Sequence, residues 1–112
     1  MAYITVTPAK GTYSIRAGGA VLGETSNALE LREGDYDPVI YVPRADVAMA
    51  FLERTDRTSH CPHKGDAAYY SVVTKSETIP DAVWTYEAPK DDVAAIRDHL
   101  AFYPGKVTVE RV

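Results

Sequence analysis

The densest group of chemically competent side chains in this 112-residue sequence lies at positions 59–66, in the order Ser-His-Cys-Pro-His-Lys-Gly-Asp. Two imidazoles, a thiol, an ammonium and a carboxylate within eight residues suit three kinds of chemistry. These are ligation of a metal, nucleophilic catalysis by a thiolate, and binding of an anion. Each kind uses a different subset of the groups, so each can be weighed separately.

Metal ligation would use His60, Cys61 and His63, with an oxygen from Asp66. Zinc sites usually take ligand pairs from two separate segments, and His99 is the only histidine elsewhere in the chain. We therefore expect no metal site and no cofactor.

Cys61 is the only cysteine and the candidate catalytic nucleophile. The ammonium of Lys64 or a protonated His60 would favour its reactive thiolate form. Burial as a small hydrophobic side chain is the commoner fate of a free cysteine, and an inert Cys61 is what we expect.

Binding of an anion would combine Lys64, the backbone next to Gly65 and the guanidinium of Arg44. No phosphate-binding glycine motif accompanies them. Aromatic side chains of the following strands could wall the same pocket, although a tyrosine-rich core is the plainer interpretation. The leading hypothesis is a site, binding or catalytic, for an anionic or polar and partly aromatic small molecule. It would be built around Arg44, Cys61, Lys64, Tyr70 and Trp84.

A competing hypothesis assigns these motifs no chemistry. Pro43, Pro62 and Gly65 would then fix the backbone, and Arg44 and Asp46 would form a local ion pair, as in an interaction or structural module. Convergence of the cations and Trp84 on one cleft would favour the small-molecule site, whereas contacts among these groups themselves would favour the module.

The elements that position these residues are predominantly strands. Alternation of apolar and polar residues predicts strands at 3–7, 12–16, 20–23, 28–33 and 39–42. The last four form two consecutive hairpins, with Gly18-Gly19 in the first turn. Residues 43–51 predict a single turn that leads into a strand. The polar segment 54–65 predicts a loop. Further strands are expected at 67–74, at 78–86 with an interruption at Pro80-Asp81, and at 107–109.

One segment, 91–101, predicts a helix. Val93, Ile96 and Leu100 fall on one stripe, and Asp91 with Asp92 supplies carboxylates to the first turn. The predicted fold class is mainly β, or α+β by strict count. It is a compact antiparallel β-sheet domain with one C-terminal helix, and a single domain spans residues 1–112.

The composition narrows the classes of partner. The net charge is −4, and no basic stripe is present to follow a phosphate backbone, so we expect no nucleic acid partner. No apolar window of the length that spans a bilayer and no signal peptide is visible, so we expect no membrane partner and a cytoplasmic location. The oligomeric state is left open.

Four ordered motifs resemble a known bacterial family, the domain of unknown function 427. They are YVPRADV at 41–47, TSHCPHKGDA at 58–67, AVWTY at 82–86 with Pro89, and AFYP at 101–104 followed by Lys106-Val107. The resemblance covers residues 12–110 and implies a compact β-rich domain without an assigned activity. His63 departs from the family pattern, which often has a bulky aromatic residue there. The family is sometimes labelled nucleotidyltransferase-like, and metal-dependent nucleotidyl transfer needs closely placed carboxylates to hold Mg²⁺. The one adjacent pair, Asp91-Asp92, is assigned here to a helix start. We therefore keep this label only as an alternative.

Overall fold

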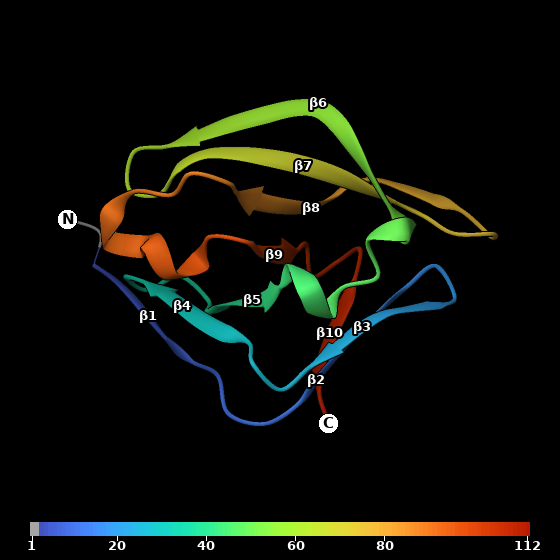
Figure 1. The fold of residues 1–112 in the computed structure, drawn as a ribbon, viewed down its shortest axis with the longest axis horizontal. Helices are drawn as coiled ribbons and strands as arrows, with labels where there is room; N and C mark the ends of the chain where they lie inside the picture. Colours follow the sequence, from blue (N-terminus) through green and yellow to red (C-terminus); the bar gives the residue numbers. More distant parts are fainter. Residues whose placement is uncertain (1–2) are drawn as a thin grey trace.

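The computed structural model describes residues 3–112, and within them ten strands form two antiparallel sheets (Figure 1). The first half of the chain contains β1 (Ile4–Pro8), β2 (Tyr13–Ala17), β3 (Ala20–Thr25), β4 (Leu29–Glu33) and β5 (Val39–Pro43). The second half contains β6 (Leu52–Cys61), β7 (Gly65–Val73), β8 (Thr78–Tyr86), β9 (His99–Phe102) and β10 (Thr108–Arg111). Three short 3-10 turns complete the fold: η1 (Arg44–Asp46), η2 (Met49–Phe51) and η3 (Asp91–Ile96).

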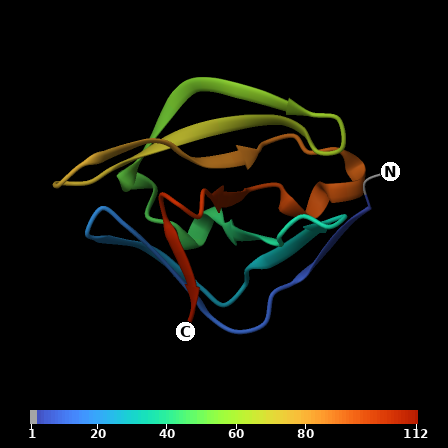
Figure 2. The ribbon, with the colours of Figure 1, turned by 180° about the vertical axis from the view of Figure 1, so that it is seen from behind.

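The larger sheet has the strand order β1-β4-β5-β9-β8-β7-β6. Strand β9 lies at its centre, where Val42 pairs with Leu100 on one side and Trp84 with Ala101 on the other. The smaller sheet has the order β10-β2-β3, and in the reverse view β10 runs beside this hairpin toward the C-terminus (Figure 2). The late segment β9 therefore joins two parts of the sheet that form from earlier segments.

Each face of the larger sheet carries a buried cluster, and successive residues of a strand contribute to opposite faces. One face packs against the smaller sheet, and its buried cluster includes Ile15, Leu22, Val42, Val72, Val83, Leu100 and Phe102. The other face carries a second cluster that includes Leu31, Tyr41, Ala67, Tyr69, Tyr86, Val93, Ile96 and Ala101. Tyr69 and Tyr70 are neighbours in β7, yet they belong to different clusters.

Strand β3 of the smaller sheet approaches η1 closely at Gly23. Gly23 forms a bridge with Val47, just after η1, and a Cβ atom at this position would overlap the carbonyl oxygen of Asp46. The Asp46 carboxylate also accepts a hydrogen bond from the Thr25 hydroxyl at 2.7 Å. These contacts connect β3 of the smaller sheet to η1, the turn that carries Arg44.

The predicted strands and hairpins are confirmed. Gly18 and Gly19 form the β2–β3 turn with positive φ angles of 56° and 77°, a conformation that costs glycine little. The strand expected at 78–86 forms as β8 without the interruption expected at Pro80-Asp81, where it contains an irregularity instead. The β7–β8 register shifts there, and Asp81 has a φ of 49°.

The predicted C-terminal helix over 91–101 is wrong. The segment forms η3 and a turn with Asp98 at a φ of 59°, and then β9. Val93, Ile96 and Leu100 are buried as expected, but Leu100 packs in the cluster on the opposite face of the sheet. Strand pairing with β5 and β8 outweighs a short helical stripe, since helices of this length are marginal without strong tertiary support.

The predicted loop over 54–65 is also wrong. Residues up to Cys61 belong to β6, the edge strand, whose register on β7 shifts between Arg54 and Thr58. The actual connection to β7 is the short turn 62–64, closed by a 3.2 Å hydrogen bond from the Lys64 amide to the Cys61 carbonyl. Segment 43–51 forms two 3-10 turns rather than one, and the expected strand follows at Leu52.

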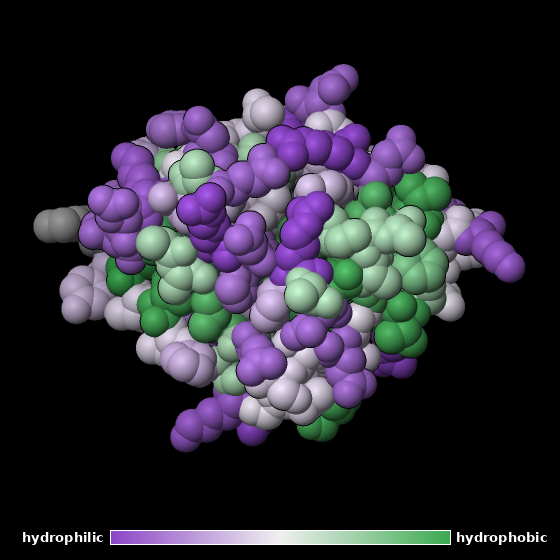
Figure 3. Space-filling view, viewed as in Figure 1, coloured by the Kyte–Doolittle hydropathy of each residue, from purple (hydrophilic) through white to green (hydrophobic). Residues whose placement is uncertain are grey.

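The molecular surface in the orientation of Figure 1 is polar at its centre. Hydrophilic side chains form a band across the middle of this face, between two more hydrophobic areas (Figure 3). No helix among residues 3–112 has the length and apolar character needed to span a membrane.

Candidate functional site

The predicted site residues lie on two sides of the larger sheet. Lys64 and Trp84 line one cavity, with Cys61 packed against the same cluster. Arg44 and Tyr70 line a different cavity. The two cations that were expected to meet at one anion therefore face separate spaces, and each cavity is described in turn.

The first cavity, called here the aromatic cavity, has a volume of about 240 Å³. It is bordered by β4, β5, the turn after β6, β7 and β8, and by the segment after β9. Its aromatic lining comprises Tyr36, Tyr41, Tyr69, Trp84, Tyr86 and Tyr103, and the remaining lining residues are Leu31, Glu33, Asp37, Val39 and Lys64.

Trp84 contacts two other aromatic residues of this cavity, Tyr41 and Tyr103. Its ring lies 4.6 Å from that of Tyr103, centroid to centroid, and meets the Tyr41 ring edge-on at 6.4 Å. The indole N–H donates to the Tyr41 hydroxyl over 3.2 Å. On the neighbouring strand, the Tyr69 hydroxyl is hydrogen-bonded to Ser59 Oγ at 2.7 Å. Three of the rings, those of Trp84, Tyr41 and Tyr69, are thus fixed through their polar ends, which leaves apolar ring surface at the cavity.

An ion pair lies among these rings. Lys64 Nζ donates to Glu33 Oε1 at 2.7 Å, and the two side chains are only 12% and 17% exposed. Nζ also lies 6.0 Å from the centre of the Tyr86 ring. Burial favours the neutral amine and is the largest influence, but the Glu33 hydrogen bond and interactions with Cys61 and Glu33 outweigh it and raise the pKa of Lys64. Lys64 therefore carries its positive charge at neutral pH.

Burial also shifts two tyrosines of the aromatic cavity. It raises the pKa of Tyr41 to about 12 despite the opposing hydrogen bond from Trp84, and it raises the pKa of Tyr86 as well. The Tyr86 hydroxyl has no hydrogen-bond partner among the described residues. Every fully buried side-chain N or O atom of residues 3–112 has a partner, so this hydroxyl is not fully buried, and Tyr86 is one of the residues that line the aromatic cavity. It remains a protonated donor at neutral pH.

The other side chains of the 59–66 cluster do not converge, because successive residues of β6 point to opposite faces of the sheet. Cys61 is partly buried on the side of the aromatic cavity, whereas His60 projects outward and pairs with exposed Asp66 at 2.6 Å. His63 is exposed in the turn and borders a separate depression with Lys90 and Asp92. No group of three or more His, Cys, Asp or Glu side chains suited to a metal ion occurs in residues 3–112.

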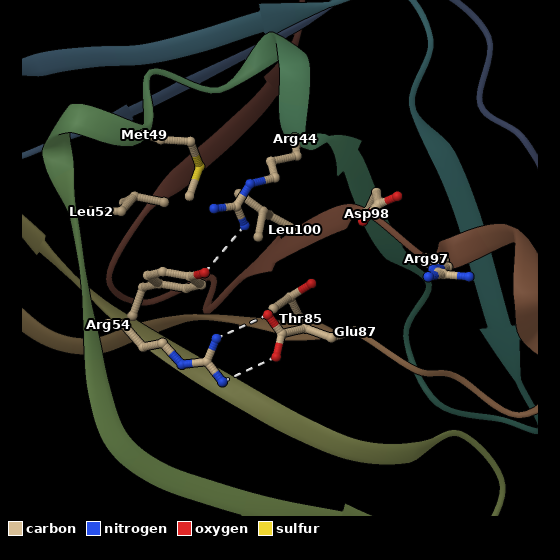
Figure 4. Close-up of a pocket in the computed structure, with 10 residues that line it drawn as sticks. Arg44, Met49, Leu52, Arg54, Thr85, Glu87, Arg97, Asp98 and Leu100 are labelled. Atoms are coloured by element: carbon tan, nitrogen blue, oxygen red, sulfur yellow. Dashed lines mark hydrogen bonds and ion pairs between the residues drawn. The ribbon is translucent and has the colours of Figure 1, made fainter.

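The second cavity, called here the arginine cleft, has a volume of about 680 Å³. Its charged lining residues are Arg44, Arg54, Arg97, Glu87 and Asp98, and the others are Met49, Leu52, Tyr70, Thr85 and Leu100. Three guanidinium groups and two carboxylates leave one net positive charge. Arg44 and Arg54 point toward the same space from opposite sides, while Arg97 lies apart from them (Figure 4).

Arg44 and Arg54 are held in different ways. Arg54 makes a two-pronged ion pair with Glu87 at 2.9 and 3.0 Å. The Arg54 hydrogen bond, with the more distant charge of Arg44 assisting, holds the pKa of Glu87 below its usual range. Arg44 Nη1 instead donates to the Tyr70 hydroxyl at 3.1 Å, and no carboxylate of the described residues lies within ion-pair distance of Arg44.

Sequence reasoning missed several lining residues. Glu33 and Tyr41 lie in strands that were predicted, but nothing local marks them as partners of Lys64 and Trp84. Asp35 and Asp37 form an Asp-x-Asp pair, the spacing associated with metal-dependent nucleotidyl transfer, and both are exposed in the turn between β4 and β5.

The comparisons with known proteins bear on the family. No curated protein matches the chain. A family model matches residues 5–112, nearly the full length, and its description is domain of unknown function (DUF427). This match includes all four motifs that border the two cavities: the η1 segment, the turn 62–64 and β7, β8, and the end of β9. The chain accordingly belongs to the DUF427 family.

Proposed function

We propose that the aromatic cavity binds a small, uncharged, planar molecule that carries a hydrogen-bond donor and acceptor side by side, such as a lactam or a nucleobase. The observation that carries this proposal is the Lys64–Glu33 ion pair among aromatic rings. Ligand sites are typically aromatic and apolar hollows with a few convergent polar groups, and this cavity has that composition.

The ion pair argues for an uncharged ligand. Lys64 and Glu33 neutralise each other, so an anion drawn to Lys64 would face the Glu33 carboxylate, and a cation drawn to Glu33 would face Lys64. A neutral group avoids both repulsions. It can accept a second hydrogen bond from the Lys64 ammonium and donate to the free Glu33 oxygen, while the Tyr86 hydroxyl supplies one more donor.

The aromatic walls and the volume argue for a flat, ring-sized ligand. The cavity of about 240 Å³ lies below the range of about 300–1,000 Å³ usual for drug-sized molecules. Tyr36, on the turn beside Glu33, lines the aromatic cavity and is 77% exposed as a residue. An exposed aromatic ring at the mouth of an aromatic cavity can cover a planar ligand from the solvent side.

The proposal changes the expected ligand from anionic to polar and neutral. It keeps Lys64 and Trp84 as binding residues and places Arg44 and Tyr70 outside this site. Cys61 stays beside the ion pair and is given no chemical step.

Titration with 2-pyridone, a flat lactam, and with adenine tests the proposal. Trp84 is the only tryptophan, so its fluorescence reports on this cavity directly. We expect a saturable change with 2-pyridone. N-methyl-2-pyridone keeps the ring but loses the N–H donor. It should bind on the order of tenfold more weakly, because the Glu33 oxygen that does not bind Lys64 then receives no hydrogen bond.

Tyrosine variants provide the matched control. Tyr86→Phe removes one hydroxyl from the cavity and should weaken 2-pyridone binding by roughly fivefold. Tyr3→Phe removes an exposed hydroxyl outside the cavity and should change nothing. The proposal fails if neither probe gives a saturable change, or if the methylated ring binds as tightly as its parent. In the first case the aromatic residues serve packing alone, as in the structural-module hypothesis.

A further inference from the structure

We infer that the arginine cleft is a second, independent binding site, for a singly charged oxyanion attached to an apolar body. The cleft lies on the other face of the larger sheet from the aromatic cavity, so the two sites share no lining residue. The inference does not depend on the ligand proposed above.

The guanidinium of Arg44 is the anchor of this site. It projects from η1 into the cleft, and its Nη1–H···Tyr70 hydrogen bond of 3.1 Å orients it. The Arg44 Cζ atom also lies 5.9 Å from the centre of the Tyr70 ring. Tyr70 is only 5% exposed, so the packing around it holds this ring in place. The backbone N–H of Arg44 donates to the Asp98 carbonyl at 2.8 Å, which fixes the start of the side chain. An arginine held at both ends loses little entropy when its remaining N–H groups bind a ligand.

The charge of the cleft selects the ligand. Arg54 is already satisfied by Glu87, whereas Arg44 retains free donors and has no acidic partner among the described residues. The planar guanidinium presents parallel N–H groups that match the two oxygens of a carboxylate or a phosphate ester. A ligand with one negative charge balances the single net positive charge of the cleft. A multiply charged ligand would be repelled by Glu87 and Asp98.

The remaining lining of the cleft selects an apolar body. Met49 and Leu52 are partly buried and Leu100 is fully buried, and all three side chains border the cleft near Arg44 (Figure 4). Thr85 adds no free donor, because its hydroxyl donates to the His99 carbonyl at 2.7 Å. The apolar part of a ligand can therefore cover these side chains while its oxyanion meets Arg44.

Benzoate is the probe, with calorimetric titration of the full chain at low salt, since surface electrostatics are screened within about 10 Å at 0.1 M ionic strength. Benzyl alcohol keeps the ring without the charge, and inorganic phosphate keeps an oxyanion without the ring. We expect both to bind on the order of tenfold more weakly than benzoate.

Three arginine variants locate the binding. Arg44→Gln should weaken benzoate binding by roughly 10- to 100-fold, the effect of losing a charge-assisted pair of hydrogen bonds. Arg44→Lys keeps the charge but not the fork, and should fall between Arg44→Gln and the unchanged protein. Arg16→Gln is the control, because Arg16 is equally cationic but pairs with Glu110 on the smaller sheet.

Several results would overturn the inference. They are benzoate binding no more tightly than benzyl alcohol, an Arg44→Gln affinity within twofold of the unchanged protein, and no measurable benzoate binding. A saturable benzoate effect on Trp84 fluorescence that persists in Arg44→Gln would place the anion in the aromatic cavity and would also refute it. Failure of 2-pyridone to bind would leave the arginine cleft untouched, so the two proposals fail separately.

Discussion

Removing one partner of the Lys64–Glu33 ion pair is expected to destabilise the protein more than removing both. Lys64→Met leaves the Glu33 carboxylate among aromatic rings without a counter-charge, and Glu33→Leu leaves the ammonium in the same situation. Breaking a fully buried pair in this way costs about 3–5 kcal/mol, whereas exposed pairs contribute about 0–1 kcal/mol. With 12% and 17% of the two side chains exposed, the pair lies near the buried limit, so each single variant should lose about 2–3 kcal/mol.

The double variant Glu33→Leu/Lys64→Met replaces the pair by apolar side chains and should recover to within about 1 kcal/mol of the unchanged protein. Urea unfolding at neutral pH, followed by far-ultraviolet circular dichroism because Trp84 lies in the perturbed cavity, gives all four free energies. The matched control is the exposed pair of Arg16 and Glu110, where the same cycle should give less than about 1 kcal/mol of coupling. Additive losses at the Lys64 pair would refute the view that it is a buried, mutually dependent unit.

Three further outcomes are expected. Leu100→Ala should cost about 2–5 kcal/mol in urea unfolding, because Leu100 is fully buried in the cluster between the sheets; a loss below about 0.5 kcal/mol would contradict that packing. Stability should fall as pH rises from about 10 toward 12. Folding raises the pKa values of Tyr41 and Tyr86, so the folded protein holds their protons more tightly than the unfolded chain does. The stability that this contributes is complete below the pKa of an unfolded tyrosine and is lost as the pH rises through the folded-state pKa values. Tyr41→Phe should flatten this alkaline loss in urea melts, and an unchanged slope would exclude Tyr41 as a source. Gly23→Ala should cost about 1–3 kcal/mol, since its methyl group overlaps the Asp46 carbonyl; a thermal melt without a shift would show that η1 can move away from β3 there.

The local parts of the fold could be predicted from the sequence. The hairpin of β2 and β3 follows from alternation on both sides of Gly18-Gly19, all within a short segment. The edge strand β6 could not be predicted in this way. Most of its side chains are exposed on both faces, so no apolar period marks it, and charged edge residues look the same in a loop. The helix predicted at 91–101 was wrong for a related reason. Burial of Leu100 is expected both for a residue on the apolar stripe of a helix and for a residue of a central strand, so the pattern could not distinguish the two.

The sequence predicted which types of residue form the candidate site, but not which of these residues contact one another. Lys64 and Trp84 do share a cavity, and Arg44 and Tyr70 are in contact. Their division between two faces depends on which strands become neighbours. The Lys64–Glu33 pair joins residues 31 positions apart, and only the completed sheet brings them together. Motif spacing carries no information about such a pairing.

The central place of β9 has a consequence for how the chain folds. Its four residues fill the gap between β5 and β8, and the pairing of Val42 with Leu100 spans more than half of the sequence. Closing so long a loop is entropically slow to initiate, and topologies rich in distant pairings fold in about milliseconds to seconds. Until residues 99–102 arrive, β5 and β8 each expose an unpaired edge. A refolding or newly synthesised chain is therefore most prone to aggregate just before this strand inserts.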